Sequence, residues 1–221
     1  MNGVITISAS FGTGGDRIGH LVADELGLPF FDRALPAAVA RHLSVPLDDA
    51  LLHDEKAPST LHRLARAFAY ASTPLGPEAL EEGIDDPDRF RQETERILHQ
   101  IADTTGGVVM GRAGMVVLRD RPDVLRVRLD GPVEARIDRV VRERGLSEAD
   151  VRAMQHDVDR AREAYVRVFY RARQSDPGLY QIVLDSTALG PEACTGAIVL
   201  VAREYLGLGP AGQGRPAAEG S

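Results

Sequence analysis

Glycine residues gather near the amino terminus, in the stretch "ISASFGTGGDRIGHLV" at residues 7–22. They lie between an apolar segment and an amphipathic one, which is the pattern of a phosphate-binding loop that leads into a helix. Backbone N–H groups in such a loop, and at the start of such a helix, are fixed partial positive charges that bind phosphate. Residues 12–19, with glycines at 12, 14, 15 and 19, meet this requirement.

This loop lacks two side chains that a phosphate-binding loop normally carries. A lysine should follow the last loop glycine and reach the β- and γ-phosphates, and a Ser or Thr should come next and hold magnesium. The chain has Gly15 and Asp16 there, and Thr13 lies inside the loop rather than at the magnesium position. Asp16 could bind the metal instead, and Arg17 could turn back over the phosphates.

Two other interpretations of the loop are open at this point. It could be a tight strand–helix turn that binds no ligand. It could also belong to a dinucleotide site, because Gly12 and Gly14 fit the first two glycines of G-x-G-x-x-G and Asp32 falls near the ribose-binding acid. The third glycine position is Arg17, however, where close helix–strand packing requires the absence of a side chain.

Short apolar segments alternate with longer amphipathic ones along the chain. Residues 4–8 predict a first, central strand, and later strands are predicted at residues 28–32, 106–111, 123–130 and 180–186. Strands separated by helices indicate an α/β fold in which a parallel sheet is covered on both faces. Ligands bind beyond the carboxyl ends of such strands. Here these ends are residues 8–15, Asp32, residues 111–112 and Asp130.

A long helix is predicted from Ser147 to about Arg173, and Ser147 with Asp150 resembles a capping box. A further helix should begin at Pro191. The core-facing stripe of the long helix should consist of Val151, Met154, Val158, Ala161, Tyr165 and Val168. Arg162 flanks that stripe, whereas Arg160, Arg167 and Arg171 lie on the opposite face.

The composition excludes several functional classes. A net charge of −7 argues against a partner that is a nucleic acid polymer, and the one cysteine, Cys194, excludes a disulfide framework or a cysteine-built zinc site. The histidines show no metal-ligand spacing, and no G-x-S-x-G nucleophile turn is present. The apolar run "AIVLVA" is too short to span a bilayer, and residues 1–8 lead directly into a strand. We therefore expect a cytoplasmic protein with no membrane partner.

Several stretches, taken in order, resemble the cytidylate kinase-like family of P-loop nucleoside monophosphate kinases. They include residues 4–40, "HDEKAPS", "GVVMGRAGMVVLRDRPDVLRVRLDGPVEARIDRV" and "DPGLYQIVLDSTALG". The family has G-S-G-G where other P-loops have G-x-G-K, which matches residues 12–15. The resemblance covers residues 3 to about 205 and implies that the missing lysine is a family trait.

The resemblance implies a P-loop NTPase-type domain over residues 1–208, followed by a disordered tail at 209–221. Within it we expect a helical acceptor-side insertion that binds the nucleoside monophosphate at 44–104 and a lid region at 147–178. The insertion either enlarges the acceptor site or forms the face of a homodimer. The residues that the resemblance implies for binding the donor ATP are Gly12, Thr13, Gly14, Gly15, Asp16 and Arg17. The substrate-binding residues that it implies for the acceptor are Asp32, Arg33 and Arg112. Ala113 replaces an aspartate that reads the pyrimidine in authentic cytidylate kinases, which leaves specificity for CMP in question.

The catalytic residues implied are Arg17, Lys56, Arg162 and Arg167, with Asp16 as the metal ligand and ATP and Mg²⁺ as cofactors. Lys56 is the one lysine of the chain, and it either replaces the absent loop lysine or is an ordinary surface residue. The preferred hypothesis is ATP-dependent phosphorylation of a nucleoside monophosphate, with CMP or dCMP as the favoured acceptor. The alternative is a catalytically inactive nucleotide sensor or partner protein of the same fold. A nicotinamide-dependent oxidoreductase is the third hypothesis.

Overall fold

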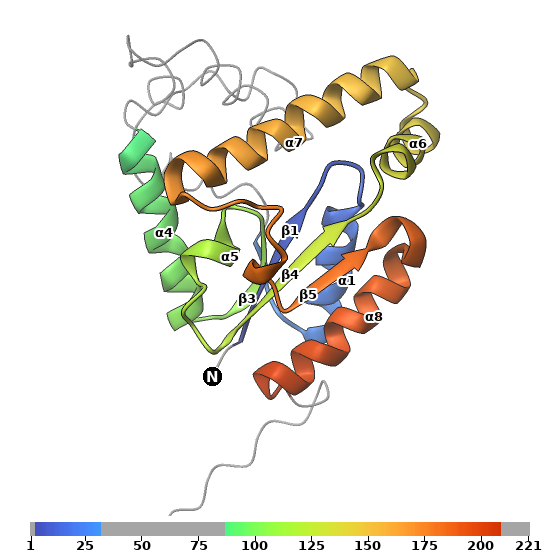
Figure 1. Cartoon of the computed structure of the whole chain (residues 1–221). Helices are drawn as coiled ribbons and strands as arrows, with labels where there is room; N and C mark the ends of the chain where they lie inside the picture. Colours follow the sequence, from blue (N-terminus) through green and yellow to red (C-terminus); the bar gives the residue numbers. More distant parts are fainter. Residues whose placement is uncertain (1–2, 32–86, 209–221) are drawn as a thin grey trace, which may run out of the picture.

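The computed structural model describes residues 3–31 and 87–208, which form a parallel β-sheet with helices on both faces (Figure 1). The strands follow the order β2-β3-β1-β4-β5. Strand β1 pairs in parallel with β3 and β4, so it lies at the centre of the sheet, as the sequence predicts. The strands are β1 (Val4–Ala9), β2 (Phe30–Phe31), β3 (Gly107–Met110), β4 (Val124–Asp130) and β5 (Ile182–Asp185).

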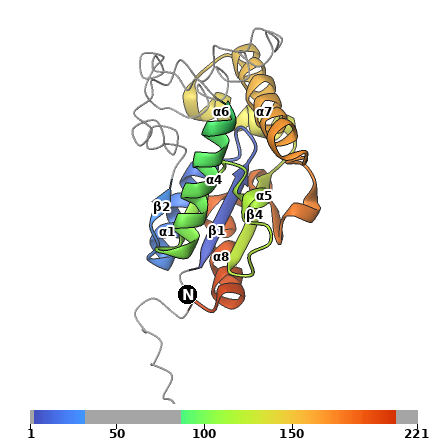
Figure 2. The same cartoon turned by 90° about the vertical axis from the view of Figure 1, so that its left-hand side faces the viewer.

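Helices cover the two faces of the sheet in pairs (Figure 2). Helices α1 (Gly15–Leu26) and α8 (Ser186–Leu206) pack on one face, with Ile18 and Ile198 buried against Ile5, Ile7 and Leu125. Helix α4 (Pro87–Asp103) packs on the other face, where Leu98 contacts a cluster that contains Val4 and Val109. The short helix α5 (Gly114–Val117) lies beside it. None of the helices in the described ranges combines the length and apolar character needed to cross a membrane.

Helix α7 (Glu148–Tyr170) crosses the carboxyl ends of the strands, from α6 (Val133–Arg144) to the top of α4 (Figure 1). The start of this helix is confirmed, with Ser147 as its N-cap. The Ser147 hydroxyl accepts a hydrogen bond from the Asp150 N–H at 3.2 Å and donates to its carboxylate at 2.6 Å. A 3₁₀ turn (Pro177–Leu179) leads from α7 to β5.

One member of the predicted α7 stripe is wrong. Val168 is 59% exposed, whereas Val166 is 3% exposed. The reason is that the two halves of α7 have different neighbours. Val151 packs with Ile137 and Val140 of α6, but Val166 packs with Ala113, Met115 and Tyr180. A single helical period cannot describe a helix whose neighbour changes along its length.

The prediction that the last helix starts at Pro191 is only partly correct, because α8 begins at Ser186. Asp185 caps a first turn through the N–H groups of Thr187 and Ala188, and Gly190 then breaks the helix with φ 75° and ψ 165°. Regular helix resumes at Pro191.

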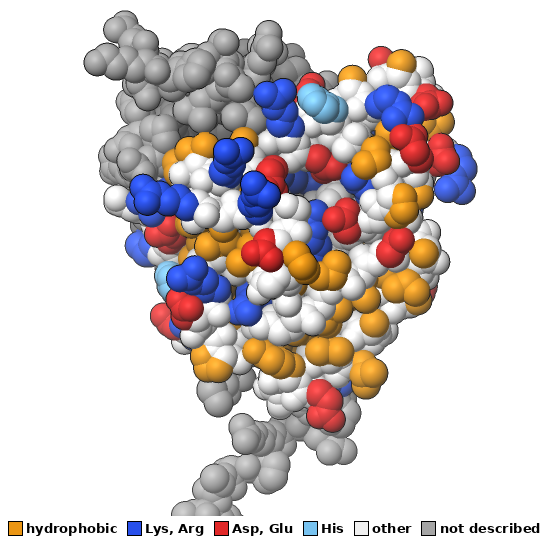
Figure 3. All heavy atoms as spheres, viewed as in Figure 1, with side chains coloured by type: hydrophobic (Ala, Val, Ile, Leu, Met, Phe, Trp, Pro, Cys, Tyr) orange, Lys and Arg blue, Asp and Glu red, His pale blue; other side chains and the backbone are white. Residues whose placement is uncertain are grey.

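Charged side chains gather on the upper half of the molecule in the view of Figure 3, and exposed apolar side chains gather on the lower half. The large apolar residues that are exposed on β5 and α8 are Val183, Leu189, Leu200 and Tyr205.

Helix α1 begins unusually close to β1. A Cβ added at Gly15 would lie 2.5 Å from the Cβ of Ala9, a separation that real Cβ atoms do not reach without movement of the backbone. Gly15 is the position at which a phosphate-binding loop normally carries its lysine. The close packing of α1 on β1 therefore requires glycine where the common motif has lysine.

We predict that Gly15→Ala lowers the free energy of unfolding by roughly 1–3 kcal/mol, because the added methyl group overpacks the contact with Ala9. Urea denaturation followed by circular dichroism measures the change. Gly196→Ala is the matched control. Gly196 lies in α8 with no atom within 4 Å of its added Cβ, so this change should stabilise the protein by up to about 1 kcal/mol. Equal stability of the Gly15→Ala variant and the wild type would contradict the packing argument.

Candidate active site

The loop between β1 and α1 (residues 10–14, the phosphate loop) lies at the carboxyl end of the central strand. Gly12 and Gly14 adopt left-handed conformations, with φ of 78° and 72°. Alternation of left-handed residues with others turns successive N–H groups toward one side and forms an anion-binding concavity. Thr13 is fully buried, and its hydroxyl donates to the Ser10 carbonyl at 2.8 Å. The Thr13 side chain thus closes the loop from within.

Arginine side chains bind the backbone carbonyls of alternate residues in this segment. The Ala9 carbonyl accepts from Arg162 Nη1 at 2.6 Å, the Phe11 carbonyl from Arg136 Nη1 at 2.8 Å, and the Thr13 carbonyl from Arg139 Nη1 at 2.9 Å. Charge-assisted hydrogen bonds of this kind are about twice as strong as neutral ones. Because arginine side chains bind these carbonyls on the outside of the loop, the N–H groups of the loop are left to bind an anion.

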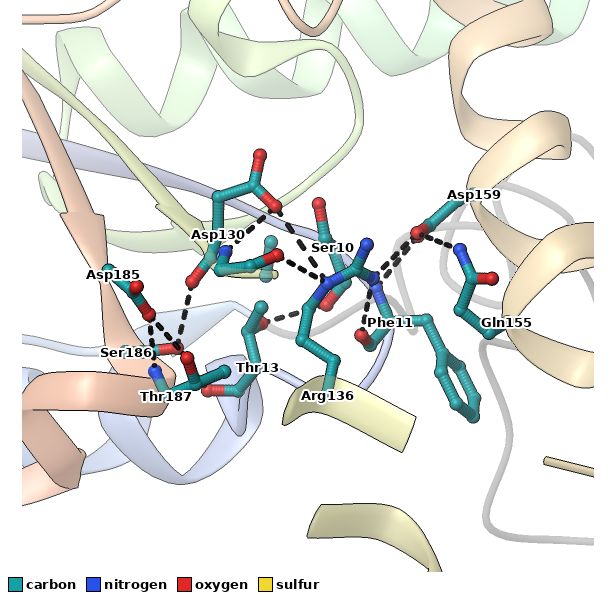
Figure 4. Close-up of polar contacts among 12 residues, drawn as sticks. Ser10, Phe11, Thr13, Asp130, Arg136, Gln155, Asp159, Asp185, Ser186 and Thr187 are labelled. Atoms are coloured by element: carbon teal, nitrogen blue, oxygen red, sulfur yellow. Dashed lines mark hydrogen bonds and ion pairs between the residues drawn. The ribbon is translucent and has the colours of Figure 1, made fainter. Parts of the chain in front are cut away.

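Arg136 is the most enclosed of these cations, with a side chain only 5% exposed. Figure 4 shows its guanidinium between the Phe11 carbonyl and the carboxyl end of β4. Its Nε also donates to the Gly131 carbonyl at 2.9 Å. A Cβ added at Gly12 would lie 2.6 Å from the Arg136 carbonyl oxygen. The phosphate loop and the first turn of α6 are therefore fitted to each other through backbone atoms as well as side chains.

A fourth arginine binds the loop through a hydroxyl group. Arg128 of β4 donates from Nη2 to the Ser10 Oγ at 2.9 Å and to the Asp130 carboxylate at 2.8 Å. Burial would raise the pKa of Asp130, but the charge and hydrogen bonds of Arg128, with those of Ser10 and the Gly131 N–H, outweigh it and lower the pKa. Asp130 therefore remains ionised and holds Arg128 beside the loop.

Asp159 of α7 contacts both the loop and its arginines. Its carboxylate accepts from the Phe11 N–H at 2.8 Å, from Arg136 Nη1 at 2.7 Å and from Gln155 Nε2 at 2.9 Å (Figure 4). Between α7 and the sheet lies a cleft of about 330 Å³. Its lining residues are Ser10, Arg128, Asp130, Arg136, Asp159, Arg162, Glu163, Gln174 and Ser175.

The first turn of α1 carries the predicted metal ligand. Asp16 is exposed there, at the helix end whose N–H groups have no intrahelical acceptor. Within the described ranges, no three or more His, Cys, Asp or Glu side chains are grouped to hold a metal ion. Magnesium at nucleotide sites is commonly held by one or two carboxylates together with phosphate oxygens and water. The exposed carboxylate of Asp16 fits that mode of binding.

The predicted catalytic arginines are only partly brought together. Arg162 contacts the base of the loop through the Ala9 carbonyl, whereas Arg167 is exposed on α7. Arg17 is directed to α8, where it forms an exposed ion pair with Glu192 at 2.6 Å. Such surface pairs are worth about 0–1 kcal/mol, so this contact does not fix the side chain. Asp32, Arg33 and Lys56 lie outside the described residues.

Arg112 lies at the carboxyl end of β3, the strand that pairs with β1. The phosphate loop follows β1. Arg112 is 4% exposed, and both Arg112 and Ala113 adopt left-handed conformations, with φ of 58° and 53°. Non-glycine residues in this region cost roughly 1–3 kcal/mol each and concentrate at ligand sites. Burial raises the pKa of Tyr165, and the positive charge of nearby Arg112 opposes that rise. Arg112 is therefore close to the aromatic end of α7.

Ala113 lies in an apolar environment. It belongs to an apolar cluster with Met115, Val166 and Tyr180. Tyr165 flanks this cluster, and its ring lies 5.1 Å from that of Phe169 and 6.0 Å from that of Tyr170. A carboxylate at position 113 would be desolvated among these side chains. This part of the molecule thus combines apolar and aromatic side chains with the nearby buried cation of Arg112.

Sequence reasoning missed Arg128, Arg136, Arg139 and Asp159. A signal for two of them was present, because α6 starts at the carboxyl end of β4 and a spacing of three puts Arg136 and Arg139 on one side of its first turns. Their partners are backbone carbonyls, and a carbonyl leaves no mark in a sequence. For Asp159 no signal distinguished it from the other acidic residues of α7.

Comparison with known proteins identifies a family that the sequence matches. Residues 4–188, well over half of the chain, match the cytidylate kinase-like family. A uronate isomerase of Corynebacterium glutamicum is 28% identical over 149 residues, which make up 66% of this chain and 28% of that protein. The chain therefore spans less than a third of the length of this curated relative.

Two solved structures share the fold. An uncharacterized protein from Eubacterium ventriosum superposes with a TM-score of 0.64 at 16% identity, over 90% of this chain and 97% of that one. A sugar kinase from Janibacter sp. superposes with a TM-score of 0.50 at 21% identity, over 96% of this chain and 98% of that one. At these identities the similarity concerns the fold alone, and it agrees with the predicted α/β architecture of a P-loop kinase. The chain belongs to the cytidylate kinase-like family, and this membership supports phosphoryl transfer as its class of chemistry.

Proposed function

We propose that this chain transfers the terminal phosphoryl group of ATP to a nucleoside monophosphate, with CMP or dCMP as the favoured acceptor. The proposal is carried by the arginines that bind alternate backbone carbonyls in the phosphate loop and at the strand residue before it. Arg136 and Arg139 bind carbonyls within the loop, and Arg162 binds the carbonyl of Ala9 at the end of β1. Phosphoryl transfer needs little covalent help from a protein. It requires aligned reactants and positive charge around the transferred group.

The residues of the loop divide this work. The N–H groups of residues 12–17, together with the Phe11 N–H before them, bind the polyphosphate, and Asp16 would hold Mg²⁺ beside it. ATP supplies a phosphoryl group with a good leaving group. Arg136 and Arg162 provide positive charge at the loop, in place of the lysine that the packing of Gly15 excludes. The close packing of Gly15 on Ala9 supports this division of roles. Because no lysine side chain fits at position 15, the loop itself lacks the usual cation.

Arg112 is assigned to the acceptor phosphate. Its position just after β3, at the end of a parallel strand where ligands bind, supports this role, and a guanidinium can bind a phosphate through two parallel hydrogen bonds. Tyr165, Phe169 and Tyr170 are suited to contact the base. Asp32 and Arg33 remain proposed acceptor ligands, and Arg17, Lys56 and Arg167 remain proposed catalytic cations. The apolar surroundings of Ala113 argue that the base is recognised differently from the way authentic cytidylate kinases recognise it.

One observation favours the alternative of a nucleotide-binding sensor without transfer activity. Asp159 engages the Phe11 N–H and Arg136, two groups that a polyphosphate would use. A protein of this kind binds nucleotide at the same loop and produces no diphosphate. Turnover separates the two functions.

We predict that the purified protein, given Mg-ATP and each nucleoside monophosphate in turn, forms diphosphate with the highest kcat/KM on CMP or dCMP. Chromatography of the nucleotides measures the product. Gly12→Val, purified in the same way, is the control for contaminating kinases, because a side chain there collides with the Arg136 carbonyl. ATP binding without diphosphate on any acceptor would favour the sensor, and preference for another base would replace CMP as the acceptor.

We predict that Arg112→Ala raises KM for the monophosphate roughly 10- to 100-fold, the loss of charge-assisted hydrogen bonds to phosphate, with little change in the Kd for ATP. Steady-state kinetics and calorimetric titration with ATP measure the two quantities. Arg160→Ala removes an exposed arginine from α7 and serves as the matched control. An equal loss of both affinities would show that Arg112 does not act on the acceptor alone.

A further inference from the structure

The carboxylate of Asp159 occupies donors that a phosphate would need. It accepts one N–H of the phosphate loop, at Phe11, and one guanidinium N–H, from Arg136. Figure 4 shows the side chain directed from α7 toward the loop, with Gln155 donating to the same carboxylate. A loop amide combined with a guanidinium is the donor set that binds a phosphate oxygen at helix N-termini. Asp159 therefore has the contacts of an anionic ligand, although it belongs to the protein.

Polyphosphate and Asp159 cannot use these donors together. Two anions at hydrogen-bond distance from the same N–H repel each other strongly when they are shielded from water. Asp159 can leave, because its side chain is 24% exposed, whereas the Arg136 side chain is only 5% exposed and is held by the Gly131 and Phe11 carbonyls. The buried guanidinium of Arg136 therefore stays in place, and the carboxylate of Asp159 is the group that a phosphate can replace.

We propose that Asp159 is an internal competitor of phosphate, which binds the loop in the absence of nucleotide and is displaced when a polyphosphate enters. Displacement transfers the Phe11 N–H and Arg136 from the carboxylate to the phosphate, and it removes this link between α7 and the loop. The apparent affinity for nucleotide is then the intrinsic affinity multiplied by the fraction of molecules in which the carboxylate has left the loop. The inference rests on the proposed function, because it requires the loop to bind polyphosphate.

The test compares Asp159→Asn with Asp157→Asn. Both changes are isosteric and remove one negative charge from α7, but Asp157 is 69% exposed and pairs with His156. An asparagine at position 159 would present its NH₂ group or its carbonyl to Arg136 and the Phe11 N–H, and it cannot satisfy both donors as a carboxylate does. We expect Asp159→Asn to bind tripolyphosphate and Mg-ATP roughly tenfold more tightly than the wild type. Asp157→Asn should stay within about twofold of the wild type.

Stability provides the readout that separates competition from a purely structural role. Loss of the ion pair with Arg136 should lower the denaturation midpoint of the nucleotide-free Asp159→Asn variant while its affinity for polyphosphate rises. A structural residue would lower both quantities. Gln155→Ala is the second variant, for use if Asp159→Asn does not fold. It removes one hydrogen bond to the carboxylate and should tighten binding about threefold.

The outcomes distinguish this inference from the proposed function. If the wild type binds tripolyphosphate and neither variant binds it more tightly, the competition is refuted and the proposed function stands. If neither the wild type nor the variants bind tripolyphosphate or Mg-ATP, both are refuted. Tighter binding by Asp159→Asn together with a lower denaturation midpoint supports the competition.

Discussion

The candidate site depends on hydrogen bonds from arginine side chains to the backbone of the phosphate loop and of Ala9, the last residue of β1 before it. Carbonyls are obligatory acceptors, and three of them, at Ala9, Phe11 and Thr13, are satisfied by guanidinium groups from α6 and α7. The same contacts supply positive charge and fix the direction of the peptide groups. A lysine side chain supplies charge alone, as a mobile point. The arrangement thus combines in one set of interactions what a common phosphate-binding loop divides between its backbone and its lysine.

These hydrogen bonds also connect parts of the fold that are distant in the sequence. Helix α6 follows β4 directly, and α7 crosses from α6 to the top of α4 (Figure 1). One half of α7 packs on α6 near the phosphate loop, and the other half packs beside Ala113 and close to Arg112. A single helix therefore touches both the proposed donor side and the proposed acceptor side. Movement of α7 would alter the two sides together.

Much of this fold follows from local pattern. Residues 4–8 and the glycines after them predict the central strand and the loop, and Ser147 with Asp150 predicts the start of α7, because both features depend on neighbours in the chain. Local pattern fails where the neighbour is distant. The periodicity of α7 places Val168 in the core, but the packing partner changes along the helix and Val166 is buried instead. The prediction of the site from the sequence was incomplete for the same reason. Arg136 and Asp159 bind backbone atoms of Phe11, from which they are separated by 125 and 148 residues in the sequence.

The contact between Gly15 and Ala9 restricts how this loop could change in evolution. In the motif G-x-x-x-x-G-K-[ST], position 9 corresponds to the first glycine and position 15 to the lysine. The chain has alanine and glycine at these two positions, and side chains at both would collide. The two sites therefore form an epistatic pair, in which a lysine becomes tolerable only after position 9 has lost its methyl group. A lineage that regained the lysine would have to pass through glycine at both positions, so the order of the two substitutions is set by steric exclusion.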